Sequence, residues 1–272
     1  MKKKRKKKKL FNIDEINAYR VAYGNPMQRK DFIKIIVIPF GVCFLFVFLL
    51  FFKWWLALIA GIGGVVYTFS FLLPNNEKRN YELKSFRERN KFVNNMTQIL
   101  TNEDRTVIQA VKTITERAQG EFKQDLIKLQ TDLIEGSNQT TQNAFRELEH
   151  KYQTDVIFSQ YLEQLTTAML EGRSNIDTLK DIKTYHNMIK DRQSTFFIEK
   201  EQRAKDFRFM IRIALIFIGV IIFSFGIRQF IQAFTESLIG WIASTIYLTL
   251  LASIYHSFAK RVADDSVLEV KL

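Results

Sequence analysis

The stretch that decides the fold is residues 35–73, which read IIVIPFGVCFLFVFLLFF, then one lysine, then WWLALIAGIGGVVYTFSFLL. These are two apolar runs, Ile35–Phe52 and Trp54–Leu73, and a second pair, Phe209–Ile227 and Leu238–Phe258, follows a long polar stretch. A helix of about 20 apolar residues crosses the hydrocarbon core of a bilayer. The pattern therefore predicts four transmembrane helices in two hairpins, rather than buried helices of a water-soluble protein.

The stretch between the two pairs, residues 75–208, predicts an all-helical domain. All three prolines of the chain precede residue 75, so the strongest helix breaker is absent here. Gly120, Gly136 and Gly172 each stand where an apolar helical pattern stops, which suits a left-handed residue just past a helix end. Apolar residues recur every three or four positions, for example through Phe122–Leu133. We expect three helix–turn–helix units, about six helices, in one bundle.

Charge predicts the orientation. The net charge is +12, and Lys2–Lys9 alone contribute +8. Lysine and arginine beside membrane spans stay on the cytoplasmic side. One side of the four spans is flanked by Arg29, Lys30, Lys34, Lys78, Arg79, Lys84, Arg87, Arg89, Arg203, Lys205, Arg208, Arg212, Lys260 and Arg261. The opposite loops contain only Lys53, and Arg228 with Glu236. We expect a multi-pass protein of the cell membrane with both termini and the middle domain in the cytoplasm.

These patterns divide the chain into five parts. Residues 1–30 are predicted to form a basic cytoplasmic tail and a juxtamembrane helix. Residues 31–74 and 209–258 form the two transmembrane hairpins, residues 75–208 the cytoplasmic helical domain, and residues 259–272 a second cytoplasmic tail. The basic tail is expected to bind anionic lipid. It has no interleaved aromatic residues to read bases, so we expect no nucleic-acid partner.

Recognisable catalytic chemistry is missing. The sequence has no phosphate-binding glycine loop, no zinc-type Cys/His spacing and no Ser–His–Asp arrangement, so we expect no enzyme, no cofactor and no metal. His186 falls on an apolar helical stripe, which favours a packed histidine. The four apolar runs contain no carboxylate, which argues against ion-coupled transport.

The second apolar run carries small residues at four-residue spacing, namely Ala57 with Gly61 and Ala60 with Gly64. Small side chains at this spacing let a neighbouring membrane helix approach closely. We expect them to pack helices together, within one chain or between protomers.

Three segments carry a resemblance to a known family. They are Phe92–Leu100, then Leu133-Ile-Glu-Gly136 with Ala144-Phe145-Arg-Glu-Leu148, then Met169-Leu-Glu-Gly172 with Leu179. This pattern, together with the domain order, resembles the type II secretion system F domain. The resemblance is closest to the tight-adherence pilus proteins TadB and TadC, which have two spans, one cytoplasmic F domain and two more spans. The family has a glycine and small residues at the first turn, where this chain has Thr101–Arg105.

The resemblance implies a non-enzymatic inner-membrane platform for assembly of a type IV pilus-like or type II secretion filament. It implies three partners: a cytoplasmic secretion ATPase, prepilin or pseudopilin subunits in the membrane, and a second copy or a paralogous platform protein. The turns between helices would contact partners, and their candidate residues are Asn102, Glu103, Asp104, Arg105, Ser137, Asn138, Glu171, Arg173 and Asn175, with Gly136 and Gly172 as the turn glycines.

A second function from another class remains open. The chain could be a membrane signalling or transport component whose helical domain senses a cytoplasmic ligand. That alternative predicts a ligand-sized pocket with convergent polar groups, or a water-filled path through the spans.

Overall fold

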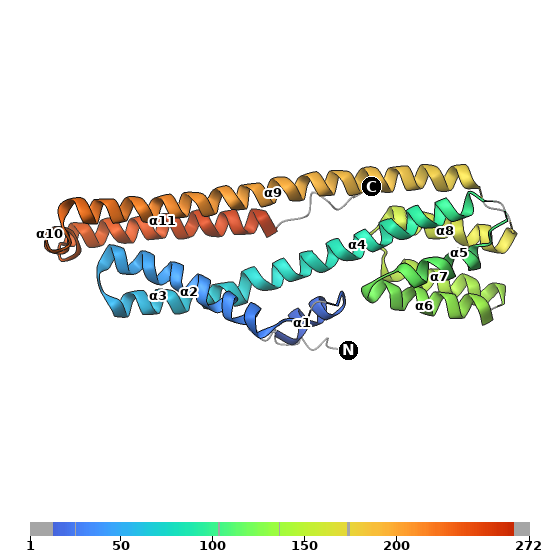
Figure 1. Ribbon diagram of the computed structural model, residues 1–272, viewed down its shortest axis with the longest axis horizontal. Coiled ribbons are helices and arrows are strands. Elements are labelled where there is room, and N and C mark those ends of the chain that lie inside the picture. Colours follow the sequence, from blue (N-terminus) through green and yellow to red (C-terminus); the bar gives the residue numbers. More distant parts are fainter. Residues whose placement is uncertain (1–12, 25, 103, 136, 173–174, 264–272) are drawn as a thin grey trace, which may run out of the picture. The chain divides into compact units, whose positions relative to one another are not determined.

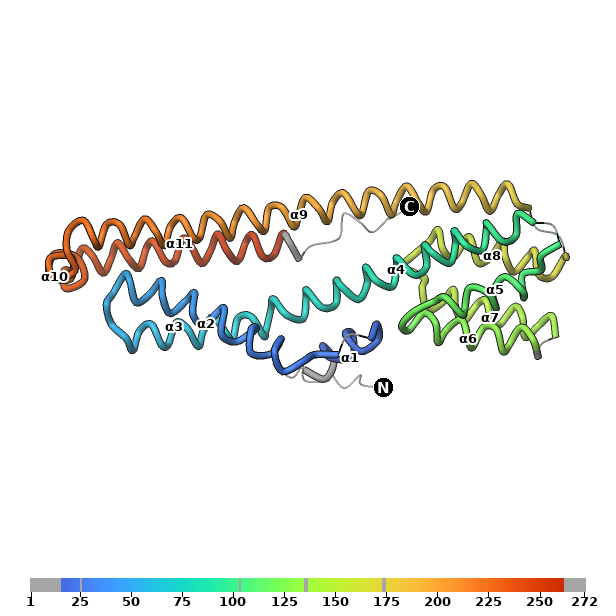
Figure 2. Tube along the Cα trace, in the orientation of Figure 1, coloured from blue at the N-terminus to red at the C-terminus, as the bar shows by residue number. Residues whose placement is uncertain are grey.

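The structure is a computed structural model that describes residues 13–24, 26–102, 104–135, 137–172 and 175–263. Every regular element within these ranges is helical, which confirms the predicted all-α class (Figure 1 and Figure 2). The helices are α1 (Ile13–Val21), α2 (Arg29–Phe51), α3 (Trp54–Tyr67), α4 (Leu73–Leu100), α5 (Val107–Arg117), α6 (Gly120–Glu135), α7 (Asn138–Lys151), α8 (Val156–Glu171), α9 (Ile176–Phe225), α10 (Ile227–Phe230) and α11 (Leu238–Ala263), with the π-helical turns η1 (Thr68–Leu72) and η2 (Ile231–Thr235).

Four helices are long and apolar enough to cross a membrane: Arg29–Phe51, Trp54–Leu100, Ile176–Phe225 and Leu238–Arg261. The four predicted apolar runs lie within these helices, apart from one or two residues at the ends of two runs. The second and third helices are 47 and 50 residues long, so each continues well beyond its apolar run. The described chain thus has the spanning helices of a membrane protein.

Pro74 lies inside a continuous helix, although the sequence places a domain boundary there. A proline ring clashes with the carbonyl group of the residue four positions earlier, and proline donates no backbone hydrogen bond. The wider π-helical turn η1 directly precedes this proline, and the N–H of Leu73 donates to the carbonyl of Thr68. A π turn adds one residue to a helix turn. The helix therefore passes from α3 through η1 into α4 without breaking.

The chain forms two compact units. The first, which we call the apolar unit, comprises the described parts of Met1–Tyr19, Pro26–Lys78 and Ile198–Asp264. The second, which we call the helical bundle, comprises the described parts of Arg20–Asn25 and Arg79–Phe197. The divisions fall inside α4 and α9 and not at helix ends. Each unit is described by itself below.

The apolar unit has a small internal core. Its largest buried cluster joins α2 to α9 and α10 and consists of Phe46, Leu50, Phe51, Ile218, Ile222 and Phe230. The rings of Phe207 on α9 and Phe258 on α11 stack at 4.6 Å. The Tyr67 hydroxyl and Nδ1 of His256 form a hydrogen bond of 3.0 Å. Most other large apolar side chains of this unit are exposed, as expected of helices whose surroundings are lipid.

The helical bundle has a continuous core. It consists of α5, α6, α7 and α8 with the adjoining parts of α4 and α9. Phe92 on α4 lies at its centre, and its ring meets those of Phe122, Phe158 and Tyr161 edge to face. The Tyr161 hydroxyl is satisfied by Thr97 at 2.8 Å. The apolar stripes predicted from helical spacing therefore face one shared interior.

Candidate functional site

The three predicted contact turns lie at the same end of the helical bundle. They connect α4 to α5, α6 to α7 and α8 to α9, and Figure 1 places all three where α4 ends and α9 begins. The described residues of these turns are solvent-exposed: Asn102, Asp104, Arg105, Ser137, Asn138, Glu171, Gly172 and Asn175. Glu103, Gly136 and Arg173 lie outside the described residues. The alternation of helix direction brings these turns together, although more than 30 residues separate each turn from the next in sequence.

Several polar residues of these turns hold the helix ends. The side chain of Ser137 accepts a hydrogen bond from the N–H of Thr140 at 3.4 Å, and Asn175 accepts one from the N–H of Thr178 at 3.3 Å. Such caps satisfy backbone donors that the first helical turn leaves free. Gly172 ends α8 with φ +68°, a conformation that favours glycine. The exposed charges of Asp104, Arg105 and Glu171 are then the groups that remain free to contact a partner.

A buried polar cluster, which we call the Arg89 cluster, joins α4, α8 and α9. Nε of Arg89 donates to the Asp155 carboxylate at 2.8 Å, and its Nη1 donates to Ser85 at 2.7 Å. The Arg89 guanidinium also lies over the ring of Tyr152 at 4.8 Å. Nε2 of His186 meets the same carboxylate oxygen at 3.4 Å. The ion pair is buried and both partners make further hydrogen bonds, which is the condition under which buried charges are tolerated.

Asp155 also caps α8, because its second oxygen accepts from the N–H of Phe158 at 3.1 Å. Burial would raise the pKa of the Asp155 carboxyl group, but the hydrogen bond from His186 and the charge of Arg89 hold that pKa below its ordinary value. The carboxylate is therefore ionised at neutral pH and ties three helices to one point.

The cluster continues as a chain of amides between α4 and α9. The Asn90 amide nitrogen donates to Nδ1 of His186 at 2.9 Å and to the Asn187 oxygen at 2.8 Å. Asn94 and Asn187 each donate to the other, at 2.8 and 2.9 Å. With Nδ1 accepting from Asn90, the proton of a neutral His186 lies on Nε2 and points to Asp155. Amide pairs of this kind specify which residues of two helices face each other.

A second, half-exposed cluster lies on α4, α6 and α7. The Tyr81 hydroxyl donates to Glu121 at 2.6 Å, and the Tyr152 hydroxyl donates to Asp125 at 2.6 Å. Lys151 bridges the two carboxylates, each at 2.7 Å. Burial alone would raise the pKa of Glu121, but hydrogen bonds from Lys151 and Tyr81 lower it. Burial alone would lower the pKa of Lys151, but the two carboxylates raise it.

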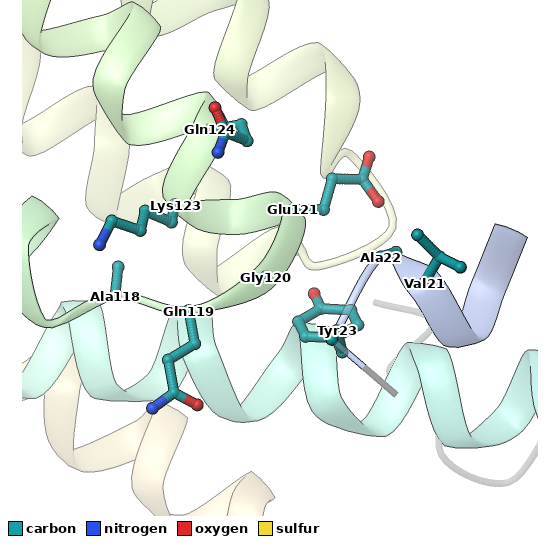
Figure 3. A pocket seen from close by; sticks show the side chains of 10 residues that line it. Val21, Ala22, Tyr23, Ala118, Gln119, Gly120, Glu121, Lys123 and Gln124 are labelled. Atoms are coloured by element: carbon teal, nitrogen blue, oxygen red, sulfur yellow. The ribbon is translucent and has the colours of Figure 1, made fainter. Parts of the chain in front are cut away.

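A hollow of about 720 Å³ lies beside the start of α6, at the other end of the bundle from the three turns. Its lining is Val21–Gly24 on one side and, on the other, Ala118 and Gln119 of the turn after α5 with residues of the first turns of α6. Figure 3 shows Val21, Ala22 and Tyr23 facing this second group. The Tyr23 ring reaches the Gly120 backbone and meets the Tyr81 ring edge-on, with 5.6 Å between centroids. The sequence analysis did not single out Tyr23.

The small residues of the second apolar run differ in their contacts within the apolar unit. Ala57 and Gly61 are buried, and a Cβ added at Gly61 would come within 2.7 Å of the Phe40 ring. A Cβ added at Gly64 would come within 2.6 Å of Sγ of Cys43. Ala60 is half-buried. Gly61 and Gly64 thus lie where α3 meets α2 of the same chain.

The described residues contain no group of three or more His, Cys, Asp or Glu side chains placed to hold a metal ion. Sequence reasoning placed His186 in a packed stripe but missed its polar partners. One signal was available: Asn90 and Asn94 are one helical turn apart, beside the apolar residues Phe86 and Val93.

Comparisons with known proteins show one full-length relative. An uncharacterized protein of Bacillus anthracis, pXO2-23, is 45% identical to this chain over 268 residues, which are 98% of this chain and 97% of the relative. No family model matches the sequence, and no solved structure matches it. At this identity and coverage, the chain belongs to the same protein family as the Bacillus anthracis protein.

Proposed function

We propose that this chain is a non-enzymatic platform of the cell membrane that supports assembly of a type IV pilus-like or type II secretion filament. The observation that carries the proposal is the chain order: two apolar helices, a helical bundle with its own core, and two more apolar helices. This order is the one that the F-domain resemblance implies. Two of the four long helices run on from apolar segments into the bundle's sequence, which suits a part that transmits mechanical work.

The proposed orientation places the bundle and both termini in the cytoplasm. The basic residues that flank the spans are solvent-exposed, for example Arg29, Lys34, Arg208 and Lys260. Exposed cations at the ends of membrane helices favour the cytoplasmic face and its anionic lipids. Cytoplasmic exposure is a requirement of the proposal, because the ATPase that drives filament assembly hydrolyses cytoplasmic ATP.

In this function the exposed turns at one end of the bundle bind a secretion ATPase, and the spans contact prepilin subunits held in the membrane. The partners at the spans include a second copy of the chain or a paralogous platform protein. The charges of Asp104, Arg105 and Glu171 offer a mixed-sign surface for the ATPase. Complementary charges of this kind set the specificity and rate of association more than its strength.

The first experiment tests orientation. The variant carries Cys43→Ala, which removes the one native cysteine, and Asn138→Cys at the exposed start of α7. A membrane-impermeant maleimide is expected to label this cysteine only after the cell membrane is opened. Labelling in unopened cells would place the bundle outside, where no ATPase reaches it, and would end the proposal.

The second experiment tests the partner surface with a matched pair of charge reversals. Arg105 and Arg117 are both exposed and lie at opposite ends of α5. Arg105→Glu is expected to reduce co-purification of a co-expressed secretion ATPase by about tenfold, whereas Arg117→Glu leaves it within about twofold. Equal losses in both variants, or no loss in either, would contradict the assignment of this surface.

A ligand-sensing signalling or transport component is the second candidate. The hollow beside Tyr23 is the feature that favours it, because its size falls in the range of small-molecule sites. Deletion of the gene separates the two candidates: loss of pili or of secreted protein favours the platform. A normal filament with a changed response to a cytoplasmic metabolite favours the sensor.

A further inference from the structure

We propose that residues 20–24 form a strap that docks reversibly on the turn between α5 and α6, with Tyr23 as its anchor. The ligand of the surface at this turn is then a tyrosine-bearing segment of the same chain. The inference does not depend on the platform function. Docking covers the surface around Gly120, and release opens it.

The docking surface is built around the absence of a side chain at Gly120. A Cβ at this position would lie 2.4 Å from Cδ1 of Tyr23 and 2.7 Å from the carbonyl oxygen of Ala22. Both distances are shorter than any ordinary contact, so the strap fits only against glycine. Gly120 also has φ +65°, a backbone conformation that other residues adopt at a cost. Glycine at position 120 is therefore favoured for two separate reasons, the close approach of the strap and the backbone conformation of the turn.

The strap is preformed as a tight turn after α1. The N–H of Tyr23 donates to the carbonyl of Arg20 at 3.3 Å, and the N–H of Gly24 donates to that of Val21 at 2.9 Å. These bonds hold Tyr23 so that its ring faces Gly120 and the edge of the Tyr81 ring, as Figure 3 shows for Tyr23 and Gly120. A ligand held in its bound shape loses little freedom on binding.

The contact is looser than the core of the bundle. The hollow of about 720 Å³ is open to the surface and is lined by both the strap and the turn, so the two segments are not packed together along their whole length. Tyr23 is only half-buried, and no strap residue belongs to the buried core cluster of the described bundle. The strap meets the bundle through the Tyr23 ring, which contacts Gly120 and the Tyr81 ring, and through the Ala22 carbonyl beside Gly120. The strap is therefore expected to detach from the turn without unfolding the core.

A pair of glycine variants isolates the strap contact. Gly120→Ala is compared with Gly172→Ala in the full-length protein in lipid nanodiscs. Gly172 has nearly the same positive φ, +68°, but nothing lies within 4 Å of an added Cβ. Backbone strain is therefore common to both variants, and only Gly120→Ala collides with Tyr23. The readouts are tryptic cleavage after Arg20 and amide hydrogen exchange of residues 20–24.

We expect wild-type strap amides to exchange faster than those of the core, because partial opening needs no global unfolding. Gly120→Ala should raise cleavage after Arg20 about tenfold, and Gly172→Ala less than about twofold. Tyr23→Ala should raise cleavage after Arg20 as much as Gly120→Ala does. The double variant should raise it little further, because both changes remove the same contact. Core amides around Phe92 should stay protected in all four variants.

Several results would contradict the proposed docking of the strap. Equal cleavage in Gly120→Ala and Gly172→Ala would mean that backbone strain, not the contact, is responsible. Effects of Tyr23→Ala and Gly120→Ala that multiply would mean that the two residues act separately. Strap amides that exchange as slowly as core amides would make the segment a fixed part of the fold. Cross-links between cysteines at positions 22 and 119 that join two chains would assign the docked segment to a second copy.

Discussion

The two units place phenylalanine in opposite environments. Phe92 in the helical bundle is 0% exposed, whereas Phe223 in the apolar unit is 88% exposed and Phe217 is 64% exposed. Both units are helical, so secondary structure does not explain the difference. The bundle folds against water and gathers its phenylalanines inside. In lipid, apolar side chains gain nothing by leaving the helix surface, so the apolar unit needs only a small internal core.

The distribution of charge also differs between the two units. Between residues 79 and 197 the chain has 17 basic and 17 acidic residues, so this stretch is neutral and the whole excess of +12 lies elsewhere. The bundle uses its charges in pairs, both buried and exposed. The remaining segments carry the excess of cations, and cations near the ends of spans attract lipid headgroups. A domain that folds in water and one that spans a membrane thus differ in both apolar and charged residues.

Asp155→Ala is expected to have the largest effect on the stability of the bundle. The change leaves the buried Arg89 guanidinium without its carboxylate partner and removes the cap of α8. Loss of one member of a buried ion pair costs about 3–5 kcal/mol. Thermal unfolding of the full chain in nanodiscs, followed by circular dichroism, should show the bundle transition at a much lower temperature. Asp177→Ala, which removes an exposed ion pair with Lys180, is the control and should cost at most about 0.5 kcal/mol.

A matched pair of phenylalanine changes comes next. Phe92→Ala should destabilise the bundle by about 3–5 kcal/mol, because it leaves a cavity in a packed core. Phe223→Ala should leave stability in nanodiscs almost unchanged, since lipid fills the space. A loss of several kcal/mol from Phe223→Ala would mean that this side chain packs against protein, and the comparison between the units would fail at that position. Equilibrium unfolding of the two variants beside wild type decides the matter.

Close packing inside the apolar unit is tested by Gly64→Ala. The added Cβ meets Cys43 at 2.6 Å, so helices α2 and α3 must separate, at a cost of about 1–3 kcal/mol. Gly63→Ala meets nothing within 4 Å and serves as the control. The measurement is the rate at which a membrane-permeant maleimide modifies Cys43. The rate should rise in Gly64→Ala only, and an equal rise in both variants would contradict the packing of α3 against α2.

The smallest effect is the dependence of bundle stability on pH. The pKa values of Asp155 and Glu121 are lowered in the folded bundle, so their contributions are present above the ordinary carboxyl pKa of about 4. These contributions are lost as pH falls through the lowered folded values. Stability should therefore stay level from pH 7 to 5 and fall below about pH 4. Glu121→Gln should flatten that fall slightly, because Glu121 is half-exposed, and Asp155→Asn should flatten it more. An unchanged slope in both variants would contradict the assignment.

Much of the fold could be predicted from sequence because its signals are local. The four apolar runs, the absence of proline after residue 74 and the helical spacing of Phe122–Leu133 each depend on neighbouring residues alone. The candidate turns were located in the same way, since Gly172 and Asn175 are residues that end or begin helices. The predicted domain boundary at Pro74 lies inside a continuous helix, where the π turn before the proline relieves its clash.

By itself, the sequence determined that this protein is helical, that four of its helices suit a membrane and where the polar domain lies. These properties depend on hydrophobic length and period, which are set by residues close together in the chain. Only the tertiary structure decided that Arg89 pairs with Asp155, that Asn90 meets His186 and that Tyr23 lies on Gly120. The partners in these pairs are 66 or more residues apart, so they meet only through the packing of whole helices.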